Sequence, residues 1–130
     1  MNVTVVDASA IAALIFDEAE GPKIGGMLSG RSTKAPVLLP LEIANVCLMK
    51  QRRRQLTATQ ARAAFDLFRE LPIEFIDVSG HAAFALGQET GLTAYDASYL
   101  WLAEHLGGDL LTLDQALHAA WRARAGAKPA

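Results

Sequence analysis

The feature that most constrains the fold of this chain is its alternation of short apolar runs with longer segments of helical periodicity. Residues 3–6 (VTVV) form a β-branched run typical of a buried strand, and residues 110–113 (LLTL) form a second apolar run. Weaker strands are expected at residues 35–39 and 73–78, and helices at 10–16, 17–29, 40–54, 57–71, 81–88, 93–106 and 115–124. Strands separated by helices form a parallel sheet that is covered on both faces. The sequence therefore predicts an α/β domain, a parallel β-sheet sandwiched between α-helices.

The size of the chain and its single cysteine limit the class of protein. A chain of 130 residues that is 52% apolar is long enough for one core and too short for two. We expect one domain over residues 1–125 and a short flexible tail over 126–130. The lone Cys47 has no partner for an internal disulfide, and residues 8–16, the longest N-terminal apolar stretch, are too few to span a bilayer. These features predict a cytoplasmic protein with no secretion or membrane signal.

Four acidic residues recur at matched places in the predicted elements. Asp7 follows the first apolar run and Asp114 follows the last one, while Glu42 and Asp96 stand near the starts of two helices. In open parallel sheets, ligands bind beyond the carboxyl ends of the strands, where Asp7 and Asp114 are expected. Carboxylates that converge repel one another, and a hard cation relieves that repulsion. The four residues together predict a divalent-metal site.

Each of these acids has an alternative interpretation as a helix-capping or first-turn residue. For Asp7 we expect Ser9 to cap the following helix, which leaves Asp7 free to bind a ligand. Asp96 occupies the third position after its cap, and Asp114 directly precedes a helix, so capping explains both. Glu42 suits the first turn of a helix, where the dipole favours an acid. Only Asp7 favours a functional role when it is considered alone.

Three further polar residues accompany the acids. Glu42 and Asn45 share one face of a helix that is nearly continuously apolar from residue 38 to 49. We expect that helix to be largely buried, so that its polar side chains need partners. Ser9 is a candidate to bind a metal-bound water or a phosphate oxygen, although capping explains it equally well, and Thr112 is a candidate to orient a water.

The net charge of −2 conceals an uneven distribution. Residues 50–72 contain two acids and six basic residues, which are Lys50, Arg52, Arg53, Arg54, Arg62 and Arg69. Residues 73–121 contain seven acids and no Lys or Arg. A polyanion that lies across the basic segment can bring a phosphate to a metal in the acidic half. The basic cluster is explained equally well as a solvated helix end that complements the helix dipole.

With these residues in place, the chain resembles the PIN-domain family, and specifically the VapC-type toxins of bacterial toxin–antitoxin pairs. The resemblance spans nearly the whole chain and is carried by residues 5–10 (VVDASA), 42–46 (EIANV), 95–103 (YDASYLWLA) and 111–114 (LTLD). It implies a metal-dependent endoribonuclease that usually forms a homodimer and is inhibited by a small cognate antitoxin. It also implies that Mg²⁺ or Mn²⁺ is bound by Asp7, Glu42, Asp96 and Asp114, with Ser9 and Thr112 as neighbouring hydroxyls and Asn45 as a supporting residue.

Other functions are weighed against this one. A phosphatase of the haloacid-dehalogenase type needs a second Asp two residues after Asp7, where this chain has Ser9. A receiver domain needs a Lys after a late strand, and no Lys lies between Lys50 and Lys128. Both phosphotransfer readings are therefore disfavoured. A non-catalytic PIN-like interaction module whose acids are helix caps stays open as the alternative.

Overall fold

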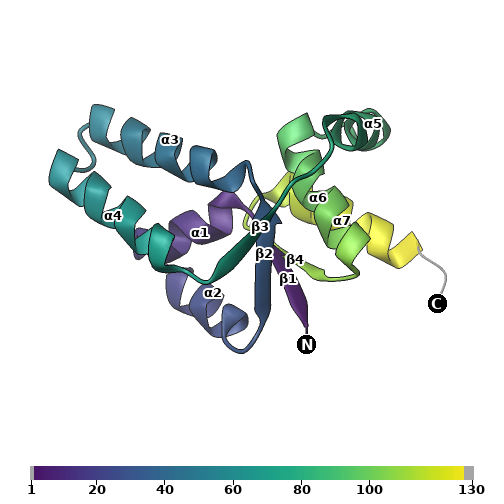
Figure 1. Cartoon of the computed structure of the whole chain (residues 1–130), viewed down its shortest axis with the longest axis horizontal. Helices are drawn as coiled ribbons and strands as arrows, with labels where there is room; N and C mark the ends of the chain where they lie inside the picture. The colour runs from purple at the N-terminus through teal and green to yellow at the C-terminus, as the bar shows by residue number, and fades with distance from the viewer. Residues whose placement is uncertain (1, 128–130) are drawn as a thin grey trace.

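The fold is a parallel four-stranded sheet with helices on both sides (Figure 1). A computed structural model describes residues 2–127. Its elements are β1 (Val3–Val6), α1 (Ala8–Ile15), α2 (Gly21–Leu28), β2 (Ser32–Pro36), α3 (Leu39–Arg52), α4 (Ala58–Glu70), β3 (Ile73–Ile76), α5 (Gly80–Thr90), α6 (Ala94–Leu106), β4 (Asp109–Leu111) and α7 (Gln115–Ala127). The predicted α/β class is confirmed.

The strands lie in the order β3-β2-β1-β4, and every pairing is parallel. In the centre of the sheet, Val5 pairs with Lys34 on one side and with Leu110 on the other. Because all four strands run in one direction, their carboxyl ends meet at one edge. The residues that follow β1 and β4 therefore come together at this edge.

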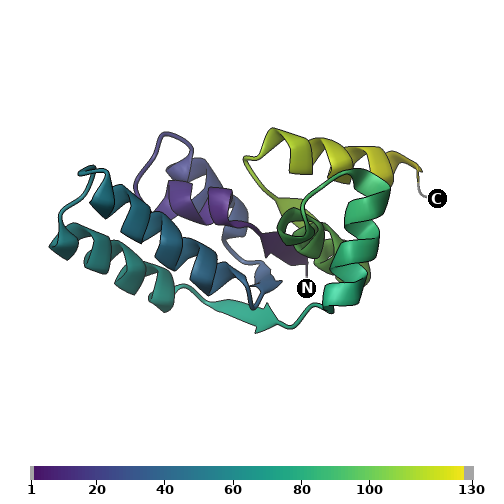
Figure 2. The same ribbon diagram turned by 90° about the horizontal axis from the view of Figure 1, so that it is seen from above.

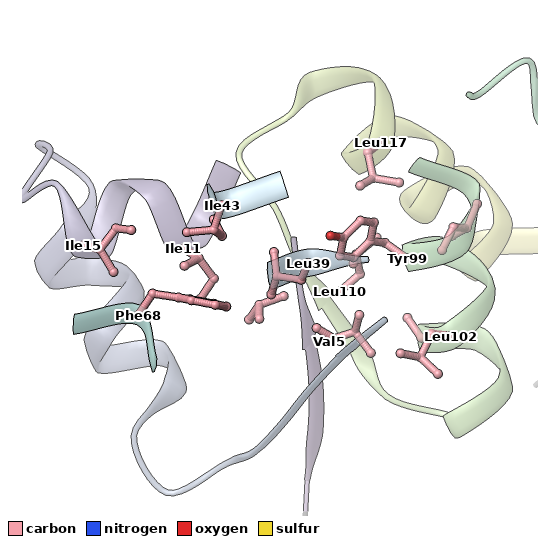
Figure 3. Packing of buried hydrophobic residues seen from close by; sticks show 14 of the residues in the cluster. Val5, Ile11, Ile15, Leu39, Ile43, Phe68, Tyr99, Leu102, Leu110 and Leu117 are labelled. Atoms are coloured by element: carbon pink, nitrogen blue, oxygen red, sulfur yellow. The ribbon is translucent and has the colours of Figure 1, made fainter. Parts of the chain in front are cut away.

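Helices α1 to α4 lie on one side of the strands, and α5 to α7 lie on the other (Figures 1 and 2). Fully buried side chains from both layers meet across β1, and Figure 3 shows them packed around Val5. Leu39 and Ile43 of α3 approach from one layer, whereas Tyr99 and Leu102 of α6 approach from the other. This core holds the starts of α3 and α6 next to the carboxyl edge of the sheet.

The prediction that Ser9 caps the first helix is wrong. The backbone of Asp7 is extended (φ −104°, ψ 179°), and its Oδ1 accepts a hydrogen bond from the N–H of Ala10. Asp7 is therefore the N-cap residue, and α1 begins at Ala8. Ser9 lies inside the first turn. The strand β1 delivers Asp7 in the extended conformation that an N-cap requires, and Ser9 comes too late for that position.

The second helix also begins later than predicted. Residues 17–20, the start of the predicted helix at 17–29, precede α2, and the first turn of α2 contains no acid. Asp17 adopts a left-handed conformation (φ 53°), which redirects the chain directly after α1. Pro22 then lies in the first turn of α2, where its missing N–H costs no hydrogen bond. At Gly21 a Cβ would lie 2.7 Å from the carbonyl oxygen of Ala13, so only glycine permits this approach of the two helices.

Two strands are displaced from their predicted ranges. The second strand covers Ser32–Pro36 instead of residues 35–39, and the last covers Asp109–Leu111 instead of 110–113. Asp109 is the first residue of β4. It forms an ion pair at 2.8 Å with Arg31, whose Nη1 also donates a hydrogen bond to Thr4. These contacts at the start of the sheet depend on residues far apart in the sequence, so local patterns did not reveal them.

The prediction that the third helix is largely buried is wrong as well. Its buried positions form one stripe, Leu39, Ile43 and Cys47, at the spacing of one helix face. Leu41 is 74% exposed, and Leu48 is also exposed. One face of α3 packs against α1 and α4, while the other presents apolar side chains at the surface.

At the carboxyl end of the chain, α7 extends to Ala127. Residues 128–130 of the predicted tail lie outside the described residues, and the division into one domain and a tail stays a prediction. Within residues 2–127, no helix combines the length and the apolar character needed to cross a membrane.

Candidate metal centre

Asp7 lies at the carboxyl end of β1 with 5% of its surface exposed. Its Oδ1 accepts hydrogen bonds from the N–H of Ala10 at 3.1 Å and from the hydroxyl of Ser9 at 2.7 Å. Its Oδ2 accepts a third hydrogen bond from the hydroxyl of Thr112. These three contacts fix the orientation of a buried carboxylate at the edge of the sheet.

The two hydroxyls also tie the end of β1 to the segment that follows β4. The Ser9 Oγ accepts a hydrogen bond from the N–H of Leu113 at 2.9 Å, and the Thr112 Oγ1 accepts one from the N–H of Asp114 at 3.0 Å. Both predicted supporting hydroxyls thus contact Asp7 directly. The same network places Asp114 beside Asp7, which lies more than a hundred residues earlier in the chain.

Asp114 caps the last helix, as its position in the sequence predicts. Its Oδ1 accepts a hydrogen bond from the N–H of Leu117 at 2.8 Å. This role occupies one carboxylate oxygen. The charge of Asp114 still acts on its neighbours, because it raises the pKa of both Asp7 and Asp96.

Glu42 is half-buried in the first turn of α3. Its Oε1 accepts a hydrogen bond from the hydroxyl of Tyr99 on α6, a contact that we did not predict. Burial, followed by the neighbouring Glu42, raises the pKa of Tyr99, so its hydroxyl stays protonated and donates. One sequence signal pointed to this residue: Tyr99 comes three residues after Asp96, on the same face of one helix.

Asn45, the predicted supporting residue, does not join this network. Its side chain is exposed, and it forms no hydrogen bond within the part of the chain that the structure describes. We expected it to need a partner because we expected α3 to be largely buried. Since only one stripe of that helix is buried, the Asn45 amide is accessible to solvent and needs no partner in the protein.

Asp96 lies in the first turn of α6, where its N–H donates a hydrogen bond to the Thr93 hydroxyl at 3.1 Å. The reciprocal contact of a capping box is missing: within residues 2–127 the Asp96 carboxylate accepts no hydrogen bond and forms no ion pair. The capping explanation that we considered for this side chain therefore does not hold. Its carboxylate is available to a ligand.

The acidic residues raise one another's pKa values. Burial is the largest cause for Asp7, Glu42 and Asp96 alike. Repulsion adds to it, since Asp7 raises the pKa of Glu42 and of Asp96, and Asp96 raises that of Glu42. The Tyr99 hydrogen bond lowers the pKa of Glu42, and the contacts to Ala10, Ser9 and Thr112 lower that of Asp7, but neither effect outweighs burial. The four carboxylates thus form one electrostatic cluster.

Positive side chains of the described residues do not neutralise this cluster, because their ion pairs go to other acids. The donor atoms are carboxylate and hydroxyl oxygens, which a hard cation such as Mg²⁺ or Mn²⁺ prefers. No three Asp, Glu, His or Cys side chains within residues 2–127 are placed to hold one ion together. Mg²⁺ usually keeps several waters and binds one or two carboxylates directly. The cluster therefore fits a hydrated cation better than a closed protein cage.

The basic residues lie elsewhere. Arg52, Arg53 and Arg54 are exposed at the far end of α3 (Figure 1), and Lys50 lies 4.8 Å above the ring of Phe16. Ten residues of helix, about 15 Å, separate Arg52 from Glu42. The structure thus gathers the four acids with Ser9 and Thr112, and it leaves Asn45 and the basic residues outside the cluster.

Comparison with known proteins identifies the family, although no family model matches the chain. The chain is 36% identical over 118 residues to Ribonuclease VapC3 of Pyrobaculum aerophilum, and the match covers 87% of this chain and 90% of that protein. The chain belongs to the VapC family of PIN-domain proteins. Ribonuclease VapC3 of Mycobacterium tuberculosis is 31% identical over 118 residues (90% of this chain, 86% of that protein), and Ribonuclease VapC9 of the same species is 32% identical over 110 residues (85% and 84%).

The fold of this VapC family member agrees with that assignment. It resembles the crystal structure of PAE2754 from Pyrobaculum aerophilum with a TM-score of 0.70 and 26% sequence identity. The match covers 92% of this chain and 84% of that one. The resemblance to PIN-domain toxins that the four motifs indicated is confirmed.

Proposed function

We propose that this VapC family member is the endoribonuclease toxin of a toxin–antitoxin pair and that it depends on Mg²⁺ or Mn²⁺. Relatives that align over most of the chain are named ribonucleases. The single observation that supports the metal dependence is the cluster of Asp7, Glu42, Asp96 and Asp114. Burial and mutual repulsion destabilise its negative charges, and no Lys or Arg within residues 2–127 forms an ion pair with it.

The side chains have distinct parts in this proposal. Asp7, held by three hydrogen bonds, and Asp96, whose carboxylate carries none, are the first choices to bind the cation. Glu42 and Asp114 each keep one carboxylate oxygen in a protein hydrogen bond and add negative charge beside them. Without a cation the cluster repels a phosphodiester, so these residues admit RNA only when they are neutralised.

When bound, the cation supplies a water of lowered pKa as the nucleophile and positive charge for the leaving oxygen. The protein then needs no side-chain general base. This agrees with the positions of the histidines: His105 stacks on Trp101 at 4.5 Å, and no His contributes to the pKa shifts of the acidic cluster.

Cleavage of RNA by the purified protein tests the proposal. Wild type should cleave in Mg²⁺ or Mn²⁺ and be inactive in EDTA, and Asp7→Asn and Asp96→Asn should be inactive while remaining folded. Asp66→Asn is the matched control, since Asp66 is an exposed acid on α4 with only a long contact of 3.8 Å to Arg69. A folded Asp7→Asn protein that cleaves at the wild-type rate would refute the assignment. Sequencing of RNA ends after expression of wild type and Asp7→Asn would identify the target.

A non-catalytic interaction module remains the second candidate, because Asp7 and Asp114 do cap α1 and α7. Calorimetric titration with Mn²⁺ separates the two functions. Caps alone bind no metal, whereas the proposed centre gives a saturable isotherm that Asp96→Asn weakens.

The remaining partners belong to the same proposal. A cognate antitoxin and a second copy of the chain are expected partners, and the exposed apolar residues Leu41 and Leu48 of α3 offer a surface for such contacts. Binding of the RNA backbone by Lys50, Arg52, Arg53 and Arg54 and a cytoplasmic location stay predictions.

A further inference from the structure

Tyr99 joins the hydrophobic core to the acidic cluster. Its side chain is 1% exposed, and its hydroxyl donates a hydrogen bond to the Glu42 Oε1. Figure 3 shows the hydroxyl oxygen on the side of the ring that faces Leu39 and Ile43, the buried residues on either side of Glu42 in α3. The ring thus packs within the core, and its polar end reaches the neighbouring helix.

Packing alone does not account for this hydroxyl. Eleven large side chains are fully buried in the described part of the chain, and Tyr99 is the one among them that carries a polar group. A phenylalanine would fill the same space without a polar atom that has to be paired. The contribution of the hydroxyl is therefore its hydrogen bond to Glu42.

Glu42 needs such a partner to keep one orientation. Its side chain rotates about three bonds, it is only half-buried, and Tyr99 is its one hydrogen-bond donor within residues 2–127. Fixing Oε1 in the Tyr99 contact leaves Oε2 for another ligand. Tyr99 lies one helical turn after Asp96, so both residues are on one face of α6. This face supplies the Asp96 carboxylate of the cluster and also the hydroxyl that contacts Glu42 on α3.

We propose that Tyr99 is a positioning residue of the metal centre, which orients the Glu42 carboxylate for the cation through its hydroxyl. This inference rests on the proposed function, because it assumes that Glu42 belongs to a metal-binding cluster. It concerns a residue that touches neither the cation nor RNA and acts only through Glu42.

Calorimetric titration with Mn²⁺ in the absence of RNA tests the inference on the full-length protein. Tyr99→Phe should weaken Mn²⁺ binding about 10-fold, the size of effect seen when a residue that orients a metal ligand is lost. Tyr95→Phe is the matched control: Tyr95 is the other tyrosine of the chain, lies on the same helix and is 63% exposed, and its hydroxyl forms no hydrogen bond among the described residues. It should bind Mn²⁺ as wild type does.

A double-mutant cycle distinguishes positioning from a general loss of packing. Glu42→Gln should weaken Mn²⁺ binding, and adding Tyr99→Phe should weaken it no further, because the hydroxyl then has no carboxylate to orient. Glu42→Asp provides a second route, since the shorter side chain keeps its charge but no longer reaches the hydroxyl. Its affinity should fall by a similar factor and be insensitive to Tyr99→Phe.

The outcomes separate the two proposals. If wild type binds no Mn²⁺, the metal-dependent function fails and the role of Tyr99 fails with it. If wild type binds Mn²⁺ and folded Tyr99→Phe binds it equally tightly, the positioning role is overturned and the function stands. The same conclusion follows if Tyr99→Phe weakens Mn²⁺ binding by the same factor in the Glu42→Gln background as in wild type. If Tyr99→Phe does not fold, Glu42→Asp decides: wild-type affinity in that variant overturns the positioning role.

Discussion

Replacing Asp7 by Asn and by Ala separates its charge from its hydrogen bonds. In Asp7→Ala, α1 loses its N-cap, which costs about 1 kcal/mol. Thr112, only 8% exposed, loses the acceptor of its hydroxyl, which costs about 1–3 kcal/mol. Part of this loss is offset, because Asp7→Ala also removes a buried carboxylate. Burial and the charge of Asp114 raise the pKa of that carboxylate. We expect Asp7→Ala to be less stable than wild type.

Asn keeps the hydrogen bonds and removes the charge. Its Oδ1 can accept from Ala10 and Ser9 as before, and its Nδ2 can donate to the Thr112 Oγ1. The Thr112 hydroxyl then turns toward the Ser9 Oγ, 3.3 Å away. Metal-free Asp7→Asn should therefore be at least as stable as wild type. The difference between the Asn and Ala variants should be about 2–4 kcal/mol, or about 10 °C in Tm for a domain of this length.

Urea denaturation at pH 7 in EDTA, followed by circular dichroism, measures these differences. The same titration in saturating Mn²⁺ completes the experiment, because a ligand at 100 times its Kd stabilises the native state by about 2.7 kcal/mol. Wild type should gain this stability, and neither variant should. Equal destabilisation of the Asn and Ala variants, with no stabilisation of wild type by Mn²⁺, would refute the reasoning and favour a purely structural Asp7.

Three further outcomes are expected. The pKa values of three cluster acids are raised in the folded state, so their contribution to stability is present below the ordinary carboxyl pKa and is lost as pH rises through the folded values. Metal-free protein should therefore gain stability as the pH falls from neutral toward the ordinary carboxyl pKa, and a steady loss over that range in urea titrations would contradict this. Arg124→Met removes the contacts of α7 with Glu104 (3.0 Å) and Glu89 (3.2 Å), and it should lower the free energy of unfolding by about 1–2 kcal/mol. Urea denaturation measures this loss, and calorimetry should show an unchanged Mn²⁺ affinity. If RNA crosses the end of α3, replacing Arg52, Arg53 and Arg54 by Ala should reduce the slope of log affinity against log salt by about 2, and an unchanged slope would place the RNA elsewhere.

The secondary structure was predictable where local signals were strong and agreed. The β-branched run of β1 and the Thr93 cap and Gly107 end of α6 are local features, and both elements form where expected. Thr57 likewise caps α4 through a capping box with Gln60. Prediction failed where the boundary of a helix depended on a turn that precedes it. The start of α2 depends on the left-handed turn at Asp17, and no periodicity encodes that turn.

The candidate site was predictable in its residues and not in its contacts. The positions of Asp7, Glu42, Asp96 and Asp114 at element boundaries were enough to propose one cluster, because parallel strands align their carboxyl ends. Asn45 was predicted from a burial pattern that α3 does not have. Its inclusion shows that an apolar helix sequence does not reveal which face of the helix is buried.

The sequence by itself determined the order of strands and helices, the α/β class and the acids at their ends, because these follow from local periodicity and backbone preference. Only the tertiary structure decided which side chains meet. Tyr99 and Glu42 are 57 residues apart, and Thr112 and Asp7 are 105 apart, so their hydrogen bonds depend on sheet register and helix packing. Long-range contacts likewise brought the N–H of Leu113 to the Ser9 hydroxyl and made Tyr99, a residue with an ordinary core pattern, the partner of Glu42.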